Sequence, residues 1–445
     1  MKLKRLFLIP FVLVSLTGCG KNVEPEPQFD YAPIDQELKG CYNYFMFATN
    51  LNEGSEGYGL TRDRLTNSTM ASIAATGFLL GSYPVFVEQG YITKEKGFEY
   101  ADKTLDTMIR IQNDAEVSYG GCISHFVNMS TGKRSGTSEI STIDTAILVS
   151  GAIVAGEYFE GSVKNKANSL WQNVDFTKFH TTKGSGGKSY ISMGVPSPTE
   201  YNQLSPWDYY AEQLMIYILG AGNPNQNHRI SSIYYKNITK TVGTYSGVSH
   251  VQSWFGSIFT YQFSQAFFNF KNYNDDKGRN WFQNSVDASK TARQFCIDNK
   301  AKYKTYSENS WGLTACDTPL GYNGDLGASP RGHNATDTQY FQVAGTIAPT
   351  GAVSSMPFTP NESYEALKYY QSLPGLNDED FGLRDAFNLD WVGTEWYDAD
   401  YIGIDKGIEV LQLYNFKNTD FISNLSMKNH YVIEGFTNNG FVAVQ

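Results

Sequence analysis

The stretch SPWDYYAEQLMIYILGAG, Ser205 to Gly222, decides the kind of fold we expect. Ser205 followed by Pro206 is typical of an N-cap and a first helical residue, and Asp208 is placed for a capping box. Two glycines near the end of the stretch are placed to stop a helix. Between these signals Leu214–Leu219 is apolar almost all round, which is typical of a buried helix. The sequence therefore predicts a helix over 205–222 within a helical core.

One carboxylate, Glu212, lies inside this apolar stretch. Burying an unpaired carboxylate costs roughly several kcal/mol, unless the group is paired or stays protonated. Glu212 is therefore either part of an ion pair with Lys or Arg across helices, or a carboxylic acid that is kept protonated for a function.

Helix-like patterns recur on both sides of this stretch, whereas strand-like patches such as 119–129 and 440–445 are short. The expected helices lie within 34–50, 68–90, 93–113, 138–159, 280–299, 361–373 and 405–416. We find no convincing repeat and no Gly/Ser/Pro-rich linker between them. The pattern favours one all-α domain, a toroid of helices whose long loops hold the functional site.

The N-terminus has the pattern of an export signal. Three basic residues precede the apolar run Leu6–Leu16, which is too short to span a bilayer as a stable helix. Leu16-Thr17-Gly18-Cys19 then resembles a bacterial lipobox, in which the cysteine is lipidated; a plain secretory signal is the alternative. We predict a signal peptide over 1–18, a lipidated polar tether over 19–35 and the helical domain over 36–445, with the lipid at Cys19 as the membrane contact.

The amino-acid composition limits the classes of molecule that we expect the protein to bind. The formal net charge of −10 argues against nucleic acid or anionic lipid. No Cys or His spacing indicates zinc, and the remaining four cysteines are too few for a disulfide scaffold. We expect no metal and no cofactor, and separately we expect a monomer. The 30 Tyr, 28 Phe and 7 Trp suit sugar rings, whose C–H faces stack on aromatic side chains.

Ten segments, in order along the chain, resemble one known family. They include GLTRDR (59–64), SEISTIDTAIL (138–148), YSENSWGLTACDTPLGY (306–322) and GTIAPTGAVSSMPFTP (345–360), and the others lie at 72–78, 125–134, 209–225, 284–296, 385–388 and 398–407. The chain resembles bacterial (α/α)6-barrel glycoside hydrolases labelled "putative glucoamylase", a family that includes β-1,2-glucanases. The resemblance implies the (α/α)6 toroid, hydrolysis of a glucan and inversion at the anomeric carbon.

The family motif around Glu212 coincides with its unusual burial, so we interpret Glu212 as the general acid. Asp400 and Asp405 flank YIGI near an expected helix start, where the helix dipole favours an ionised carboxylate. We favour Asp400 as the general base and Asp405 as a structural or subsite residue, with simple helix capping as the alternative for both.

Further residues are candidates for substrate binding, and each has a structural alternative. Glu139 and Asp144 are interpreted as sugar-hydroxyl ligands or as supports of the site, and Arg62 with Asp63 as an ion pair or a grip on the glucan. The candidates for stacking on sugar rings, each as compatible with a place in the core, are Trp207, Tyr306 and Trp311.

The sequence also departs from the family pattern at YQFSQAFFN (261–269), CDTP (316–319), GIDKGI (403–408) and Tyr414. We expect these residues to line the cleft. The favoured substrate is a β-1,2-glucan or a sophoro-oligosaccharide. The alternatives are a hydrolase for another glucan linkage and a non-catalytic glycan-binding lipoprotein.

Overall fold

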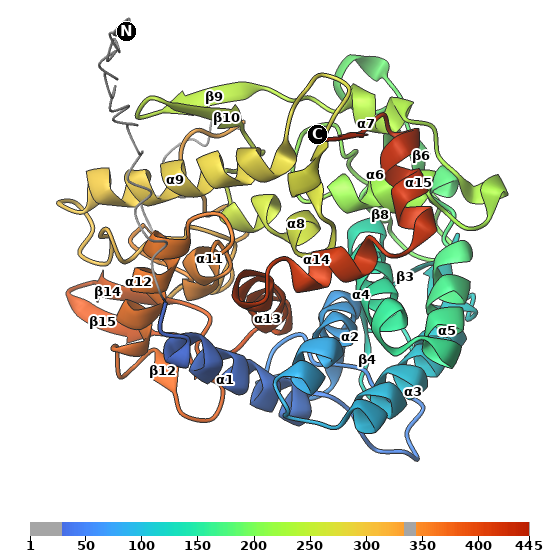
Figure 1. Ribbon diagram of the computed structural model, residues 1–445, viewed down its shortest axis with the longest axis horizontal. Coiled ribbons are helices and arrows are strands. Elements are labelled where there is room, and N and C mark those ends of the chain that lie inside the picture. The colour runs from blue at the N-terminus through green and yellow to red at the C-terminus, as the bar shows by residue number, and fades with distance from the viewer. Residues whose placement is uncertain (1–28, 333–343, 445) are drawn as a thin grey trace, which may run out of the picture. The chain divides into compact units, whose positions relative to one another are not determined.

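The computed structural model describes residues 29–332 and 344–444, and residues 32–445 form one compact, mostly helical unit (Figure 1). The expected signal peptide and Cys19 lie outside the described residues. The first helix begins at Ala32, four residues before the predicted domain boundary at 36, so the end of the predicted tether is helical.

The α-helices are α1 Ala32–Ala48, α2 Ile73–Glu88, α3 Lys94–Gln112, α4 Thr142–Phe159, α5 Gly161–Gln172, α6 Leu214–Ala221, α7 Ile233–Asn237, α8 Phe263–Phe267, α9 Trp281–Asn299, α11 Pro349–Val353, α12 Pro360–Gln371, α13 Gly403–Lys417, α14 Phe421–Ser426 and α15 His430–Asn438. The strands are β1 Met70–Ser72, β2 Ser118–Tyr119, β3 Cys122–Ile123, β4 Phe126–Asn128, β5 Ile140–Ser141, β6 His180–Thr181, β7 Tyr190–Ile191, β8 Gly194–Val195, β9 Val242–Tyr245, β10 Val248–Val251, β11 Tyr273–Asn274, β12 Asn377–Asp378, β13 Gly382–Leu383, β14 Phe387–Trp391, β15 Thr394–Tyr397 and β16 Val442–Ala443.

Figure 1 shows α2, α4, α6, α8, α11 and α13 towards the middle of the unit, with α1, α3, α5, α9, α12 and α15 outside them. Neighbouring inner helices contact one another, as α2 does with α4 and α13. The prediction of an all-α domain is confirmed as a mostly helical one; the closed toroid of six helix pairs stays a prediction.

The helix pair α2 and α4 packs most closely because glycines lie where the two backbones meet. A Cβ atom on Gly77 would lie 2.5 Å from the Cα of Leu148, and one on Gly151 would lie 1.8 Å from the carbonyl oxygen of Gly77. Helix α4 is apolar and long enough to cross a membrane, but 89% of it is buried inside the unit. Its hydrophobicity is therefore that of a core helix.

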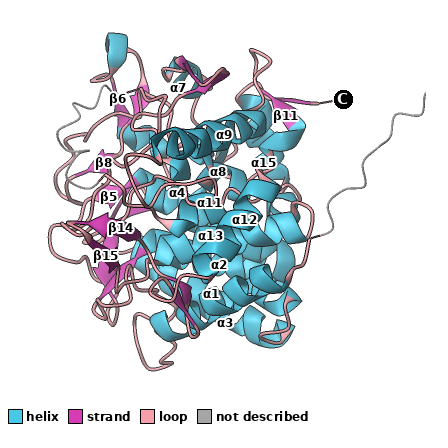
Figure 2. Ribbon diagram, turned by 90° about the vertical axis from the view of Figure 1, so that its left-hand side faces the viewer, coloured by secondary structure: helices cyan, strands magenta, loops and turns pink. Residues whose placement is uncertain are grey.

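The strands within residues 29–332 and 344–444 pair in two-stranded ladders, among them β1–β4, β5–β8 and β14–β15. Figure 2 shows β5, β8, β14 and β15 on one side of the helical body, among the long loops. Loops on a rigid helical scaffold are where binding and catalytic residues are usually placed.

The helix predicted over 205–222 is wrong in its first half, because α6 begins only at Leu214. Pro206 pairs with Ser192 in a β-bridge, and the N–H of Trp207 donates to the carbonyl of Ile191. The side chain of Gln213 accepts from the N–H of Ala211 and donates to the carbonyl of Tyr209. These contacts hold 205–213 as a loop, and Glu212 lies in its last turn rather than in mid-helix.

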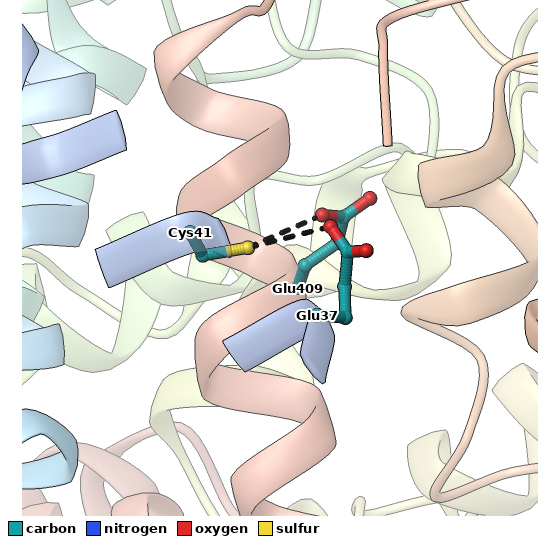
Figure 3. A group of neighbouring side chains, drawn as sticks. All are labelled: Glu37, Cys41 and Glu409. Atoms are coloured by element: carbon teal, nitrogen blue, oxygen red, sulfur yellow. Dashed lines mark hydrogen bonds between the residues drawn. The ribbon is translucent and has the colours of Figure 1, made fainter. Parts of the chain in front are cut away.

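A buried charged cluster joins α1 to α13 (Figure 3). Glu37, Cys41 and Glu409 offer ligand atoms within 4.8 Å of one another, but the Lys406 ammonium lies 2.7 Å from Glu37 Oε1 and 3.2 Å from Glu409 Oε2. A cation of the chain itself therefore balances these carboxylates. The Cys41 thiol, like those of Cys122, Cys296 and Cys316, is buried and forms no disulfide.

Candidate active site

Glu212 borders a pocket with a volume of about 760 Å³. Burial raises the pKa of its carboxyl to about 7, with a further increase from the charge of Asp144 and an opposing effect of its own backbone N–H. The Ser264 hydroxyl from α8 donates to the Glu212 carbonyl at 2.6 Å and accepts from the Met215 N–H at 3.1 Å. The turn that carries Glu212 is thus fixed by a neighbouring inner helix.

Aromatic and polar side chains share the walls of this pocket. Its aromatic lining residues are Trp207, Tyr209, Trp254, Phe255 and Phe259. Rings beside a carboxylic acid can stack on the C–H faces of a sugar while polar groups bind its hydroxyls.

The three stacking candidates have different positions. Trp207 lines the pocket, and its indole N–H donates to the Thr142 hydroxyl at 3.2 Å. Trp311 and Tyr306 are only 0% and 2% exposed, which favours a place in the core over stacking on a sugar for both. The backbone N–H of Trp311 donates to the buried Tyr370 hydroxyl at 2.9 Å.

Glu139 and Asp144 meet at His125, a residue that we did not single out in the sequence. His125 Nδ1 lies 3.0 Å from Glu139 Oε1, and Nε2 lies 3.5 Å from Asp144 Oδ1. Burial disfavours the charged imidazole, but Asp144 and Glu139 outweigh it and raise the pKa of His125 to about 9. At neutral pH this histidine is therefore a cation that braces both carboxylates, and the hydroxyl of Ser141 donates to Asp144 as well.

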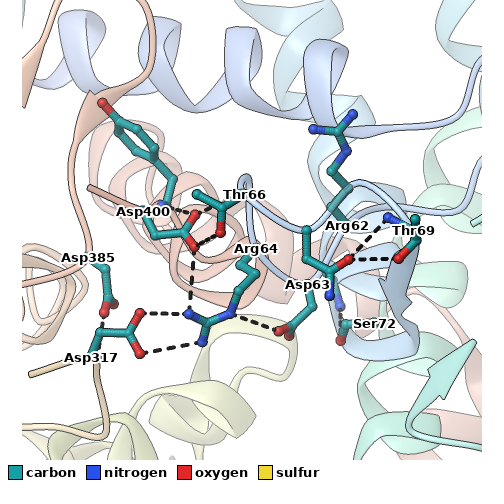
Figure 4. A network of polar contacts seen from close by, with 12 residues as sticks. Arg62, Asp63, Arg64, Thr66, Thr69, Ser72, Asp317, Asp385 and Asp400 are labelled. Atoms are coloured by element: carbon teal, nitrogen blue, oxygen red, sulfur yellow. Dashed lines mark hydrogen bonds and ion pairs between the residues drawn. The ribbon is translucent and has the colours of Figure 1, made fainter. Parts of the chain in front are cut away.

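A second network centres on Arg64 rather than on Arg62 (Figure 4). Arg64 Nη1 lies 2.7 Å from Asp317 Oδ2 and 3.6 Å from Asp400 Oδ2, and its Nε lies 3.7 Å from Asp63 Oδ2. Burial raises the pKa of Asp63, although Arg64 and His125 oppose this effect. Of the two alternatives for Arg62 and Asp63, the ion pair is wrong, because Asp63 pairs with Arg64; a grip on the glucan stays a prediction.

Arg62 points away from that network in Figure 4. Its Nη1 donates to the Leu65 carbonyl at 3.0 Å, and its guanidinium lies over the Phe47 ring. It lines a separate pocket of about 250 Å³ together with Asn50 and Ser68.

The two aspartates near α13 differ in what their carboxylates contact. Asp400 is 5% exposed and accepts from the N–H of Thr66 (3.1 Å), the hydroxyl of Thr66 (2.5 Å) and the N–H of Tyr401 (2.9 Å). Asp405 lies in the first turn of α13 and is half-buried. Burial raises the pKa of Asp405 to about 6, while a hydrogen bond from Asp385 and the charge of Lys406 act in the opposite direction.

Asp317, Asp385 and Asp398 bring carboxylate oxygens within 4.8 Å of one another beside Asp405. Oxygen ligands of this kind suit Ca²⁺ or Mg²⁺. However, the guanidinium of Arg64 already contacts Asp317 with two nitrogens, and burial raises the pKa of Asp398 to about 6 and that of Asp385 well above its usual range. Arginine and retained protons thus reduce the negative charge, and we assign no metal to this group.

Most of the segments that depart from the family pattern lie beneath the site. Tyr261–Asn269 is buried throughout, and its Gln262 side chain donates to the Gly351 carbonyl and the Ser355 hydroxyl. Tyr414 is 5% exposed and Lys406 belongs to the buried cluster. The expectation that the departing residues line the cleft is therefore wrong for Tyr261–Asn269, Lys406 and Tyr414, whereas Asp317 of CDTP contacts Arg64 in the polar network.

Sequence reasoning missed four residues that organise the site: His125, Arg64, Asp317 and Asp385. His125, Arg64 and Asp385 each lie in a segment that matched the family, at the start of HFVNMSTGKR, the end of GLTRDR and the start of DAFN. Charged residues in such segments were a usable signal, but their pairing across long loops was not visible in the sequence.

Comparison with known proteins places the chain among described relatives. Residues 204–430 match the family described as "Putative glucoamylase". The chain is 24% identical over 455 aligned residues to the exo β-1,2-glucooligosaccharide sophorohydrolase of Parabacteroides distasonis. That alignment covers 92% of this chain but only 58% of the relative, so the chain spans little more than half of the relative's length.

Solved structures share the fold. A crystal structure described as a putative glucoamylase from Bacteroides uniformis superposes with a TM-score of 0.79 at 24% identity, covering 94% of this chain and 99% of the other. The endo-β-1,2-glucanase of Chitinophaga pinensis, solved with sophorotriose and glucose, gives a TM-score of 0.78 at 23% identity over 94% and 99% of the two chains.

These likenesses agree with the motifs that run through the sequence from GLTRDR to GIDKG. The family match spans half of the 445 residues and contains Glu212, Asp400 and Asp405. The chain therefore belongs to the "Putative glucoamylase" family.

Proposed function

We propose that this protein is a glycoside hydrolase that cleaves β-glucan, with β-1,2-glucan or sophoro-oligosaccharides as its substrate and inversion at the anomeric carbon. The observation that carries the proposal is Glu212, a carboxyl with a pKa of about 7 on the wall of an aromatic pocket. Such a group is protonated often enough near neutral pH to donate a proton to a leaving glycosidic oxygen. The names of the relatives support the β-1,2 linkage.

The inverting reaction also needs a carboxylate that activates water on the opposite face of the sugar. The sequence favoured Asp400, but three hydrogen bonds from Thr66 and Tyr401 already occupy its oxygens. We propose Asp405 as the base, because it is less buried than Asp400 and a pKa of about 6 leaves it largely ionised at neutral pH. Asp400 then fixes the loop at Thr66 to the start of α13.

The pocket and the aspartates are joined by the segment between Leu313 and Leu326. Its Gly324 lines the Glu212 pocket, and its Thr314 hydroxyl accepts from the N–H of Phe259 on the pocket wall. The charge of Asp405 contributes to the raised pKa of Tyr322, two residues from Gly324. This continuity supports one cleft that contains both Glu212 and Asp405.

The rival function is a glycan-binding lipoprotein without activity, which the departures from the family pattern made plausible. The burial of Tyr261–Asn269 and Tyr414 weakens it, because the changes leave Glu212 and Asp405 in place. A hydrolase for another glucan linkage would have the same acid and base, so linkage is decided by assay.

The test is turnover of linkage-defined gluco-oligosaccharides by wild type and by Glu212→Gln. The substitution keeps the shape of the side chain but removes the proton donor, so turnover should fall by roughly 10²–10⁴-fold. Substrates with a good leaving group, which need little protonation, should lose less. NMR during early turnover should detect product with inverted anomeric configuration.

Matched aspartate variants complete the test. Asp405→Asn should lower turnover about as much as Glu212→Gln, while Asp400→Asn should act mainly on stability. Retained configuration, or a fully active Glu212→Gln protein, contradicts the assigned mechanism. Binding of a glucan without turnover by wild type would favour the glycan-binding rival.

A further inference from the structure

Asp385 is a buried carboxyl that the mechanism above does not use. It is 4% exposed and immediately precedes β14. Its N–H donates to the Asp400 carbonyl at 3.1 Å, and its Oδ2 accepts from the Asp317 N–H at 2.7 Å. Its other oxygen, Oδ1, has no hydrogen-bond donor among the residues that the structure describes. One half of this buried carboxyl is therefore satisfied and the other half is not.

The carboxyl groups of Asp385 and Asp405 are close enough for a hydrogen bond between them. Two ionised carboxylates both accept, so such a bond requires a proton on one of them. A proton on Asp385 Oδ1 would turn the unsatisfied oxygen into a donor and leave Oδ2 to accept from Asp317. The hydrogen-bonding needs of the buried group are then all met.

The surroundings place the proton on Asp385 rather than on Asp405. Burial, and then the charge of Asp405, raise the pKa of Asp385 well above its usual range. Asp405 is less buried than Asp385, and the charge of Lys406 favours its ionised form. In the resulting pair Asp385 is the neutral donor and Asp405 the charged acceptor.

Other ionisable groups face the pair. Asp317, Asp398 and Cys316 surround Asp385, and Asp63, Asp317 and Tyr322 act on Asp405 besides Lys406. The nearest guanidinium, that of Arg64, is engaged by Asp317, Asp63 and Asp400. These neighbours are mostly acidic, so they too disfavour a second negative charge at Asp385.

We propose that Asp385 is a positioning residue: its carboxylic acid donates a hydrogen bond to Asp405 and keeps one oxygen of that base turned towards the attacking water. The inference rests on the proposed function, in which Asp405 accepts a proton from water. Asp385 keeps its own proton throughout the reaction, so the pair transfers only the proton that water loses.

The kinetic test compares Asp385→Ala with Asp385→Asn on the gluco-oligosaccharide that wild type cleaves. The asparagine carbonyl can accept from Asp317 while its NH₂ group donates to Asp405, so Asp385→Asn should rescue turnover to within about threefold of wild type. Asp385→Ala should lower kcat by about 10–100-fold and change KM by less than about twofold.

The acidic limb of the pH profile of kcat/KM gives the sign of the effect. Loss of a donated hydrogen bond raises the pKa of a buried carboxylate, so the limb of Asp385→Ala should move to higher pH. The limb should stay in place for Asp385→Asn. A shift to lower pH in both variants would mean that Asp385 is ionised, which overturns the proposal.

The pH dependence of protein stability tests whether Asp385 is protonated, and it requires no measurement of turnover. A carboxyl whose folded pKa is raised contributes stability below its unfolded pKa of about 3.9 and loses it as pH rises through the folded pKa. The Tm of Asp385→Asn relative to wild type should therefore rise steadily from pH 4 to pH 8. A constant difference would show that Asp385 carries no extra proton and would overturn the proposal.

A failure of the proposed function and a failure of the positioning role of Asp385 give different results. If Asp405→Asn is as active as wild type, Asp405 is not the base, and the positioning role of Asp385 is then wrong as well. The Tm series still shows whether Asp385 is protonated. If Asp405→Asn is inactive but Asp385→Ala keeps both kcat and the acidic limb, the proposed function stands and the positioning role alone fails.

Discussion

His125 has its two ring nitrogens directed at two different carboxylates, Glu139 and Asp144. A neutral imidazole could donate to only one of them, whereas the cation donates to both. The pKa of about 9 follows from this arrangement, and it means that a positive charge lies against Asp144 in the first turn of α4. The charge holds Asp144 in place, and Asp144 in turn contributes to the raised pKa of Glu212.

The first prediction concerns pH and stability. The folded pKa of His125 is about 9 and the ordinary value is 6.5, so its stabilisation is fully present below about pH 6.5 and is lost as pH rises through 9. Replacement by Asn should cost on the order of 2 kcal/mol at pH 6, allowing for partial exposure, and much less at pH 9.5. Urea unfolding at a series of pH values measures the difference.

His228→Asn is the matched control, because the His228 ring contacts the Gln172 carbonyl and Asn225 and, among the described residues, no carboxylate. The stability loss of that variant should vary little across the same pH range. A loss for His125→Asn that is independent of pH would contradict a protonated imidazole.

At the scale of the element, α1 and α13 are joined by charge as well as by apolar packing. The Lys406 side chain is 2% exposed, and the carboxylates of Glu37 and Glu409 are 0% and 3% exposed. Glu37 also accepts from the N–H of Leu383 in β13. The cluster thus joins the first helix, a late helix and a strand from a third part of the chain.

Removing the Lys406 cation alone should strongly destabilise the folded protein. Lys406→Met leaves two buried carboxylates without a positive partner and should cost about 3–5 kcal/mol in the free energy of unfolding. Adding Glu37→Gln and Glu409→Gln to that variant should restore most of the loss, because amides carry no charge and residue 37 can still accept from Leu383. Denaturant unfolding of the single and triple variants checks this, and equal stability of the two would contradict a charge-balanced cluster.

Helices with long periodic patterns could be predicted from the sequence, and α1, α2, α3, α4, α9, α12 and α13 are confirmed. The short inner helices α8 and α11 could not, because five-residue helices have too few turns to produce a period. The first half of 205–222 failed for another reason. Its start signals are real local preferences, but bridges to Ser192 and Thr239 from distant segments override them.

At the scale of the whole molecule, the carboxylate of Glu212 could be found from the sequence because a charged residue within an apolar stretch indicates a buried charge. The pairing of Arg64 with Asp317, 253 residues away, leaves no such trace, and neither does the hydrogen bonding of Asp400 to Thr66. Contacts between long loops depend on how the helices arrange those loops in space. The fold class and one catalytic candidate were therefore accessible from sequence, but the polar network between them was not.

Export and anchoring also belong to this scale. If Cys19 carries lipid, wild type should fractionate with membranes, and Cys19→Ala should release the protein or leave it with an uncleaved signal. Fractionation followed by immunoblotting measures the distribution, with Cys41→Ser as a control that changes a thiol inside the folded unit. Membrane association that is unchanged by Cys19→Ala would contradict the lipobox.

The four buried thiols inside the helical unit can report local unfolding of the regions around them. They lie in α1, in β3, in α9 and in the loop at Cys316, and burial raises the pKa of each. A thiol reagent needs the exposed thiolate, so each site can be alkylated only while its part of the chain is open. The time course of alkylation, followed by peptide mass spectrometry, would therefore rank four separate regions by how often they unfold under native conditions.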